Sequence, residues 1–269
     1  MLRIGYHVSV AKSIDLAFDR AAEMGCTAMQ IFVSNPRGWE VKDIPEEDVG
    51  NFIGKSKTFD VDPVVAHMPY LPNLGSTGEA THKKTTETLD KTIRLCSELG
   101  IKYLVTHLGS HLGKGTETGI RNVIAAINQA DGLGRVKLLL ENTSGSTNSI
   151  GSTVEELAAI YDGVSGKVGF CLDTCHLFAA GYDIRKAETM DEIYGKVGMK
   201  NVNLFHLNDT KFDLGSHLDR HENIGKGFIG AEGIRKFLSH KGVKEKPMIL
   251  ETPENFPKEL DLVRKLAGN

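Results

Sequence analysis

Gly169-Phe170-Cys171-Leu172-Asp173-Thr174-Cys175-His176 contains a short apolar run that leads into two residues able to bind a metal. A run of this length, followed by polar residues, is typical of a buried strand. The same arrangement recurs along the chain. The other five runs and the residues that end them are Val64-Val65-Ala66 before His67, Tyr103-Leu104-Val105-Thr106 before His107, Leu138-Leu139-Leu140 before Glu141, Val202-Asn203-Leu204-Phe205 before His206, and Met248-Ile249-Leu250 before Glu251. A fold that collects its strand ends at one point would bring six metal-binding side chains together.

Strand-like and helix-like segments alternate through the whole chain. The predicted strands are 2–7, 28–32, 63–67, 102–107, 136–141, 167–173, 202–206 and 247–251. The predicted helices are 13–24, 45–58, 80–99, 117–131, a helix capped by Ser152 or Thr153 that runs to 161, 176–180, 186–197, 231–239 and 258–266. Eight β/α units without a linker predict an α/β fold, a single-domain (β/α)8 TIM barrel over 1–269. A doubly wound open sheet is the alternative that this pattern leaves.

Length and composition are those of an ordinary globular domain. The chain has 269 residues, of which 40% are hydrophobic and 25% charged, and no apolar run approaches the ~20 residues of a membrane helix. Residues 1–7 read as a strand and lack the layout of a secretory signal. We therefore expect a cytoplasmic protein without membrane association. Its four cysteines show no spacing typical of a disulfide framework, which favours free, mostly buried thiols.

The formal net charge of −3 argues against a nucleic-acid-binding protein, because such proteins are usually basic. Bound cations would change this balance. Three divalent ions would bring the net charge from −3 to about +3, and that positive charge would be concentrated at one face.

The strand ends are where a (β/α)8 barrel places its active site. One His or carboxylate there is more often a loop polar group or a helix cap, but six strands sharing the feature are hard to explain that way. Two local pairs extend the set. Asp173 and His176 are three apart where a strand turns into a helix, and Asp219 and His221 are two apart, so that in an extended segment they point the same way. The nine candidates, all of types that Zn²⁺ and Mn²⁺ accept, are His67, His107, Glu141, Asp173, His176, His206, Asp219, His221 and Glu251.

Several longer motifs of the sequence resemble a known family, the zinc-dependent apurinic/apyrimidinic (AP) endonucleases of the endonuclease IV type, and the resemblance covers essentially the whole chain. The motifs are Gly5-Tyr6-His7-Val8-Ser9, Ala66-His67-Met68-Pro69-Tyr70-Leu71-Pro72-Asn73-Leu74, Glu141-Asn142-Thr143, Leu172-Asp173-Thr174-Cys175-His176-Leu177-Phe178-Ala179-Ala180-Gly181-Tyr182-Asp183, His206-Leu207-Asn208-Asp209, and His217-Leu218-Asp219-Arg220-His221-Glu222-Asn223-Ile224-Gly225.

The resemblance implies three Zn²⁺ ions, with Mn²⁺ as an alternative at one or more sites. By the pattern of the family, the ligands are His67, His107 and Glu141 for the first ion, Glu141, Asp173, His206 and Glu251 for the second, and His176, Asp219 and His221 for the third. Glu141 would bridge two ions, and Glu251 would be a ligand that also takes part in proton transfer. Two neighbouring metal ions suit phosphodiester hydrolysis, because they stabilise both the attacking and the leaving oxygen.

The implied activity is hydrolysis of the phosphodiester bond 5′ to an abasic site in duplex DNA, which leaves a 3′-OH and a 5′-deoxyribose phosphate. Repair of blocked 3′ ends, as a phosphodiesterase or phosphatase, is implied as well. Arg37, Tyr70 and Leu71 would enter the DNA at the lesion, although on their own they also read as loop-packing or surface side chains. The expected partner is duplex DNA that holds these lesions, and the expected state is a monomer.

Two other classes of protein compete with this interpretation. A metal-dependent sugar isomerase or epimerase on a related barrel uses one or two metals held mainly by carboxylates, and it would not need His67, His107, His176 and His221 together. A catalytically inactive lesion-binding protein would be expected to lack at least one ligand, yet every position is filled.

Overall fold

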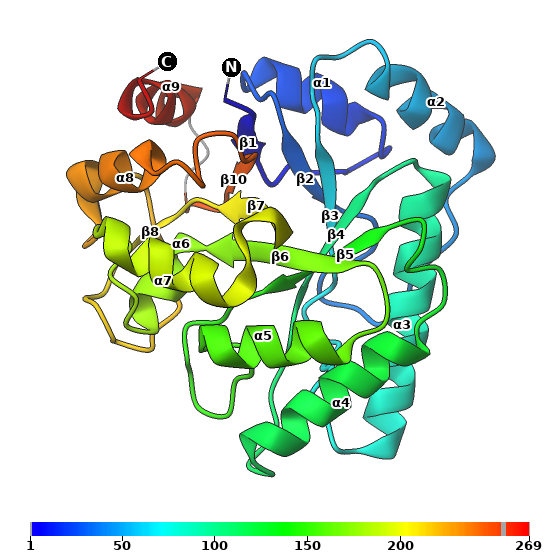
Figure 1. The fold of residues 1–269 in the computed structure, drawn as a ribbon. Coiled ribbons are helices and arrows are strands. Elements are labelled where there is room, and N and C mark those ends of the chain that lie inside the picture. Colours follow the sequence, from blue (N-terminus) through cyan, green and yellow to red (C-terminus); the bar gives the residue numbers. More distant parts are fainter. Residues whose placement is uncertain (1, 254–256, 269) are drawn as a thin grey trace.

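Parallel strands form the centre of the molecule (Figure 1). The computed structural model describes residues 2–253 and 257–268. Within them, an eight-stranded sheet has the order β1-β10-β7-β6-β5-β4-β3-β2. Its strands are β1 (Ile4–Tyr6), β2 (Met29–Phe32), β3 (Val64–His67), β4 (Tyr103–His107), β5 (Lys137–Glu141), β6 (Val168–Asp173), β7 (Val202–His206) and β10 (Met248–Leu250).

The two outer strands of this order meet and close the sheet. His7, which follows β1, forms a parallel bridge with Gln30 of β2, and the Val8 amide donates to the Gln30 carbonyl at 2.7 Å. Each strand therefore has a neighbour on both sides, as a barrel requires. The predicted (β/α)8 barrel is confirmed, and the open sheet is wrong.

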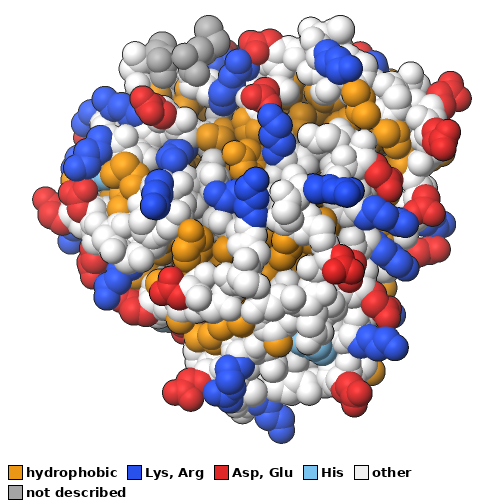
Figure 2. Space-filling model, turned by 45° about the vertical axis from the view of Figure 1, so that its right-hand side comes forward, with side chains coloured by type: hydrophobic (Ala, Val, Ile, Leu, Met, Phe, Trp, Pro, Cys, Tyr) orange, Lys and Arg blue, Asp and Glu red, His pale blue; other side chains and the backbone are white. Residues whose placement is uncertain are grey.

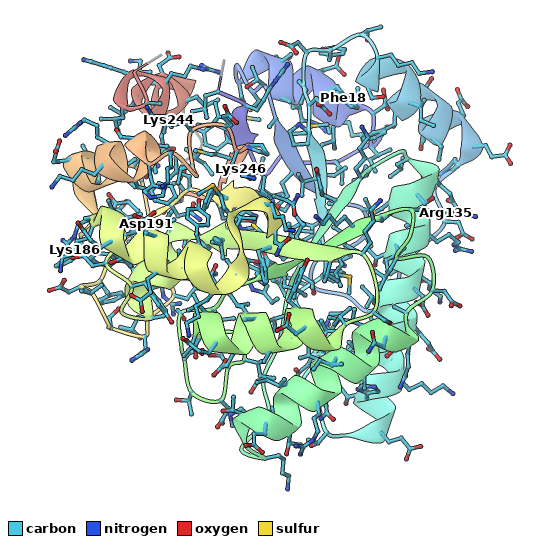
Figure 3. The ribbon with its side chains drawn as sticks, viewed as in Figure 1. Phe18, Arg135, Lys186, Asp191, Lys244 and Lys246 are labelled. Atoms are coloured by element: carbon cyan, nitrogen blue, oxygen red, sulfur yellow. The ribbon has the colours of Figure 1, made fainter. Side chains whose placement is uncertain are left out.

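Helices surround the barrel on its outside (Figure 1). They are α1 (Leu16–Glu23), α2 (Glu46–Ser56), α3 (Glu79–Glu98), α4 (Thr116–Gln129), α5 (Val154–Gly163), α6 (Thr174–Ala179), α7 (Ala187–Val197), η1 (Met199–Asn201), α8 (Gly230–Ser239) and α9 (Pro257–Leu266). The Thr153 side chain caps α5 by accepting from the Glu156 amide, as predicted. In Figure 3, Phe18 belongs to α1 and is fully buried, whereas Lys186 and Asp191 lie exposed at and near α7.

Two apolar layers hold the fold together. One lies inside the barrel and is made of small and medium side chains from strands, namely Ala28, Val65, Val105, Leu139, Cys171, Leu204 and Ile249. The larger layer lies between strands and helices. Because alternate residues of a strand face opposite sides, most strands contribute to both layers. All four cysteines are free and buried, as expected, and Cys171 lies in the inner layer.

The structure differs from the predicted elements mainly near the strand ends. β10 ends at Leu250, so Glu251 follows the strand instead of closing it. The segment after β7, predicted as one long loop, contains an antiparallel pair of short strands, β8 (Asp209–Thr210) and β9 (His221–Glu222). Strands of two residues are too short to give a periodic signal. That 1–269 form a single domain stays a prediction.

The outer surface is charged and mixed. On the face in Figure 2, Lys and Arg side chains cross the middle, and acidic side chains lie mostly toward the margins. Among the described residues, no helix is long and apolar enough to span a membrane.

Candidate metal centre

The parallel barrel carries the predicted metal-ligating residues to one end. Because neighbouring strands run in the same direction, their last residues lie side by side. His67, His107, Glu141, Asp173 and His206 are the last residues of β3, β4, β5, β6 and β7, Glu251 follows β10, His176 lies in α6, His221 begins β9, and Asp219 lies two residues before His221. All nine are thus brought to the C-terminal ends of the strands.

Glu141 lies at the centre of this group and is fully buried. Its Oε2 is 3.1 Å from His67 Nε2 and 3.4 Å from His107 Nδ1. Its Oε1 is 2.9 Å from His206 Nδ1 and 3.7 Å from His176 Nδ1. Each carboxylate oxygen therefore faces a different pair of imidazoles, which is the arrangement that a bridging carboxylate needs.

Two sets of candidate ligand atoms meet at Glu141. The atoms of His67, His107 and Glu141 lie within 4.8 Å of one another, and so do those of Glu141, Asp173, His206 and Glu251. Within the second set, His206 Nδ1 is 3.3 Å from Glu251 Oε2. These sets have the same members as the first two ligand groups that the family resemblance implied.

The remaining residues meet around Asp219. Its Oδ2 is 3.3 Å from His176 Nε2, and its Oδ1 is 3.4 Å from His221 Nε2. Asp173 also reaches this group, because its Oδ2 is 3.6 Å from His221 Nε2. Cys175 is close enough to Asp219 and His221 to share a metal with them, but burial raises the pKa of its thiol, which disfavours the thiolate.

Charge within the centre is stabilised by the candidate ligands themselves. Burial opposes ionisation of Glu141, yet the imidazoles of His107 and His206 hold the pKa of its carboxyl well below the ordinary value. Glu251 behaves similarly. Burial again opposes ionisation, but the charge of His206 lowers its pKa. Both carboxyl groups are therefore ionised at neutral pH and available to a cation.

In the group around Asp219, the same kind of interaction changes the pKa of an imidazole. Although burial favours the neutral ring, the carboxylates of Asp173 and Asp219 raise the pKa of His176 to about 10. The pKa of Asp219 falls to about 2, because its interaction with His176 outweighs its desolvation by burial. Protons and divalent cations therefore compete for the nitrogens of His176.

The chemistry of this donor set fits divalent metal ions. Imidazole nitrogens and carboxylate oxygens are the atoms that zinc and manganese accept. His221 Nε2 is buried and has no hydrogen-bond partner among the described residues, although it faces two carboxylates. In the described part of the chain, no Lys or Arg side chain forms an ion pair with the carboxylates of Glu141, Asp173, Asp219 or Glu251.

Buried amide side chains surround these candidate ligands, and the sequence motifs predicted no role for them. Asn142 Oδ1 accepts from the Asp173 amide at 2.7 Å, and Asn208 Nδ2 donates to Asp173 Oδ2 at 2.6 Å. The Gln30 amide contacts His206 and Glu251. The sequence did contain a signal for Gln30, because it is a polar residue within the apolar strand Met29–Phe32. The roles of the two asparagines depend on contacts across strands, which spacing along the chain does not reveal.

The predicted DNA-contacting residues lie on exposed loops beside the centre. Tyr70 is 56% exposed and Leu71 is 44% exposed, and Arg37 is exposed as well. The Tyr70 ring centroid is 6.1 Å from that of His67 and 6.2 Å from that of His107. The Tyr70 amide donates to the Pro36 carbonyl at 2.9 Å, so the loops that carry Arg37 and Tyr70 are joined.

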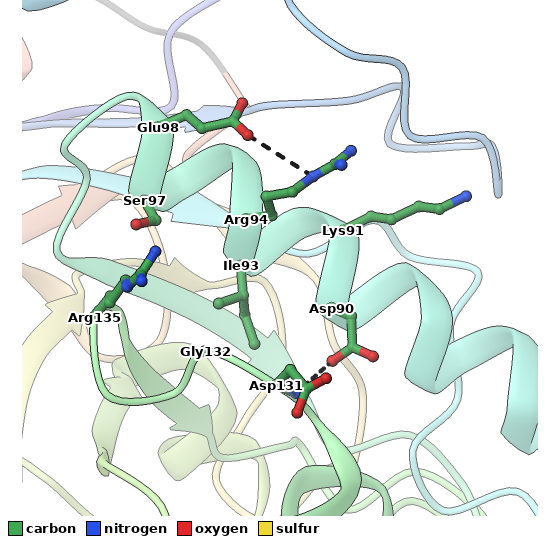
Figure 4. Close-up of a pocket in the computed structure, with 9 residues that line it drawn as sticks. All are labelled: Asp90, Lys91, Ile93, Arg94, Ser97, Glu98, Asp131, Gly132 and Arg135. Carbon is green, nitrogen blue, oxygen red and sulfur yellow. Dashed lines mark hydrogen bonds and ion pairs between the residues drawn. The ribbon is translucent and has the colours of Figure 1, made fainter.

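A groove of about 540 Å³ lies elsewhere, on the outer helical layer between α3 and the segment before β5 (Figure 4). Its charged groups interact with each other. Arg94 Nε is 3.8 Å from Glu98 Oε1, and Asp90 accepts from the Asp131 amide at 2.8 Å. None of the predicted site residues lines this groove, so the predicted metal chemistry belongs to the strand ends.

The fold and the centre together define a metal-binding enzyme built on a TIM barrel. A family model described as "Xylose isomerase-like TIM barrel" matches residues 18–266. The chain is 48% identical to "Probable endonuclease 4" of Methanoculleus marisnigri, with 100% of both chains covered, and 44% identical to "Probable endonuclease 4" of Cenarchaeum symbiosum, with 99% and 100% covered. The protein belongs to the endonuclease IV family.

Solved structures agree with this assignment. The structure of endonuclease IV from Thermus thermophilus superposes with a TM-score of 0.87 at 33% identity and covers 99% of this chain and 98% of that one. A D-tagatose 3-epimerase-like protein superposes with a TM-score of 0.76 at 19% identity, covering 99% and 97%. The second likeness shows a common barrel and carries no argument about the reaction.

Proposed function

We propose that this protein is a DNA-repair AP endonuclease, which hydrolyses the phosphodiester bond 5′ to an abasic site in duplex DNA and leaves a 3′-OH and a 5′-deoxyribose phosphate. Phosphodiesterase or phosphatase action on blocked 3′ ends belongs to the same proposal. The carrying observation is the group of nine imidazole and carboxylate side chains at the strand ends. The 48% identity to "Probable endonuclease 4" over the whole length supports the proposal.

Three divalent ions, Zn²⁺ with Mn²⁺ as an alternative, are the proposed cofactors. His67 and His107 would share one ion with Glu141, and Glu141 would share the next with Asp173, His206 and Glu251. His176, Asp219 and His221 would hold the third ion, and the nearness of Asp173 to His221 supports a close contact between the second and third sites.

Phosphodiester hydrolysis needs an activated nucleophile and stabilised charge on the phosphoryl and leaving oxygens. Bound divalent ions supply Lewis-acid stabilisation and lower the pKa of a coordinated water. The chain contributes the fixed positions of the donors. Glu141 holds two groups of imidazoles at its two oxygens, and its burial excludes water. Glu251, ionised and less enclosed, is the proposed residue for proton transfer.

The loops beside the centre are proposed to recognise the lesion. Arg37, Tyr70 and Leu71 would enter the minor groove as a wedge and kink the duplex. An abasic nucleotide has no base pair to lose, so its rotation out of the helix costs less than that of a normal nucleotide. Selectivity for abasic sites would follow from this difference, since the wedge itself reads no base.

The test combines metal analysis with a nicking assay. We expect three metal ions per chain by elemental analysis, and single-strand cleavage of a duplex with one abasic site that prolonged chelation abolishes. An undamaged duplex of the same sequence is the control. Fewer than two ions per chain, or no cleavage by the fully loaded protein, would contradict the proposal. Epimerisation of a ketose by the same preparation would favour the sugar-epimerase alternative. The monomeric state and the cytoplasmic location stay predictions.

A further inference from the structure

Gln30 lies at the seam where β1 and β2 close the barrel. It is fully buried, and its backbone pairs with His7 across the seam. Its side chain turns toward the metal centre, where it meets residues from three other strands or strand ends. The Gln30 amide is within hydrogen-bond distance of His7, His206 and Glu251.

The contact with Glu251 fixes which way round the Gln30 amide lies. Gln30 Nε2 is 2.7 Å from Glu251 Oε1. An ionised carboxylate only accepts hydrogen bonds, so the nitrogen of the amide must be the atom on that side. The amide oxygen, Oε1, then lies on the other side, where it is 2.9 Å from His206 Nε2.

This orientation in turn determines how His206 is protonated. An amide oxygen only accepts, so His206 Nε2 must carry a proton and donate it. When His206 is neutral, its lone pair is then on Nδ1, the nitrogen that lies 2.9 Å from Glu141 Oε1 and 3.3 Å from Glu251 Oε2. The nitrogen that faces both carboxylates is therefore the one that can bind a metal.

The second N–H of the amide has a partner as well. Gln30 Nε2 is 3.1 Å from His7 Nδ1, and the His7 ring packs against Phe32 at a tilt of 38°, with ring centroids 4.2 Å apart. Both amide hydrogens and the amide oxygen are thus used, and neither end of the side chain can turn without losing a buried hydrogen bond.

We propose that Gln30 is a positioning residue for the metal centre, which selects the Nε2–H form of His206 and holds Glu251 in place for the ion that these two residues share. This inference rests on one part of the proposed function, the binding of metal ions at this centre. One amide orders an imidazole and a carboxylate at the same site, so its loss weakens binding of that ion and leaves the ion at Asp219 bound.

Gln30→Met tests the proposal, because Met has a similar volume and cannot make the three hydrogen bonds. Metal-free protein is titrated with Zn²⁺ in competition with a chromophoric chelator. We expect one of the bound ions to be held about 10–100-fold more weakly in the variant and the others to be unchanged. Thr92→Val is the matched control, since it removes a buried hydroxyl that donates to the Thr88 carbonyl in α3, far from the centre. Wild-type zinc affinity in Gln30→Met would overturn the proposal.

A second measurement uses the wild-type protein and does not depend on whether the variant folds. Two-bond ¹H–¹⁵N spectra of the zinc-loaded protein report the tautomer of each imidazole. The proposal requires His206 protonated at Nε2, and a proton at Nδ1 would overturn it. Neither measurement needs DNA, so a protein that passes both yet fails to nick an abasic duplex contradicts the proposed function alone.

Discussion

Glu141 shows how a fully buried carboxylate is kept charged without a Lys or Arg partner. A lone carboxyl in an apolar site would be protonated, because desolvation disfavours its ionised form. Here four imidazole nitrogens lie between 2.9 and 3.7 Å from its two oxygens, and the imidazoles of His107 and His206 lower its pKa against the effect of burial. The ionised state of Glu141 therefore depends on the neighbouring imidazoles, and their charge in turn depends on Glu141.

Replacing Glu141 by Gln is expected to abolish cleavage of an abasic duplex. The amide fills the same volume but has only one acceptor oxygen, so it cannot serve both pairs of imidazoles. We expect the nicking rate to fall by at least about 100-fold and the bound metal to fall by at least one ion per chain. Circular dichroism should show a folded protein. Glu117→Gln, an exposed carboxylate in α4, is the control, and wild-type nicking by Glu141→Gln would rule out a bridging role.

His176 makes the stability of the metal-free protein depend on pH. Its pKa rises from 6.5 to about 10 in the folded state, because the carboxylates of Asp173 and Asp219 outweigh burial. The protonated form thus favours folding. This contribution is complete below pH 6.5 and is lost as the pH rises toward 10, at no more than about 1.4 kcal/mol per pH unit.

We therefore expect the free energy of unfolding of the metal-free protein to fall between pH 6.5 and 9. Urea unfolding in the presence of a chelator measures it, with His176→Gln as the comparison, because that variant lacks this contribution. His206, whose pKa is also raised, adds a dependence of the same sign to both proteins. Parallel pH profiles for the two proteins would show that His176 does not titrate in this way.

At the scale of elements, the segment after β7 is held by one carboxylate. Asp209 is fully buried and accepts from the backbone amides of Gly225, Gly227, Ile229 and Gly230 at 3.0–3.1 Å. Gly227 must approach closely, because a Cβ there would lie 2.3 Å from the Thr210 carbonyl oxygen. β8 begins at Asp209 and pairs with β9, so the same contacts place His221.

Asp209→Ala is expected to loosen this segment and to weaken the outermost metal site. Loss of charge-assisted hydrogen bonds to four backbone amides should lower the free energy of unfolding by about 3 kcal/mol. We also expect hydrogen exchange to rise over 219–230 and one metal ion per chain to be lost. Asp213→Ala in the same segment is the control, since the Asp213 side chain is exposed and, among the described residues, accepts from a single backbone amide, that of Leu214. Full metal content in Asp209→Ala would contradict this role.

DNA recognition by the loops after β2 and β3 can be tested separately. Tyr70 and Leu71 expose apolar surface beside the centre, and neither provides a metal-ligating atom. Replacing both by Ala should weaken binding to an abasic duplex by about 10–100-fold, the range expected for lost stacking on one or two bases. Metal content should not change. Fluorescence anisotropy measures the affinity, and an unchanged affinity would place the wedge elsewhere.

The strand ends were predictable for a physical reason. Buried parallel strands are apolar throughout, so the first His, Asp or Glu after such a run marks the edge of the barrel, and β3 to β7 end at the predicted residues. Contacts between strands were not predictable in this way. The hydrogen bonds of Gln30 reach side chains on or just after three other strands, and Asp173 proves close to His221 as well as to His176. Sequence spacing carries no information on such distances.

For the whole molecule, charge decides whether DNA can approach the strand ends. The chain has a formal net charge of −3, and the centre gathers carboxylates that would repel phosphates. Three divalent ions would bring the net charge to about +3 and reverse the sign at this face. Attraction between such a face and DNA arises largely from the release of counterions, so it weakens as salt rises.

We therefore expect the metal-free protein to bind duplex DNA on the order of tenfold more weakly than the loaded protein at low salt, and the difference to shrink as salt is added. An uncleavable phosphorothioate duplex allows both states to be measured by anisotropy between 50 and 200 mM salt, about the range over which such contacts are screened. Circular dichroism of the metal-free protein separates loss of charge from unfolding. If folded metal-free protein bound DNA as tightly as loaded protein, the loops alone would supply the attraction, and the centre would act only on the bond it cuts.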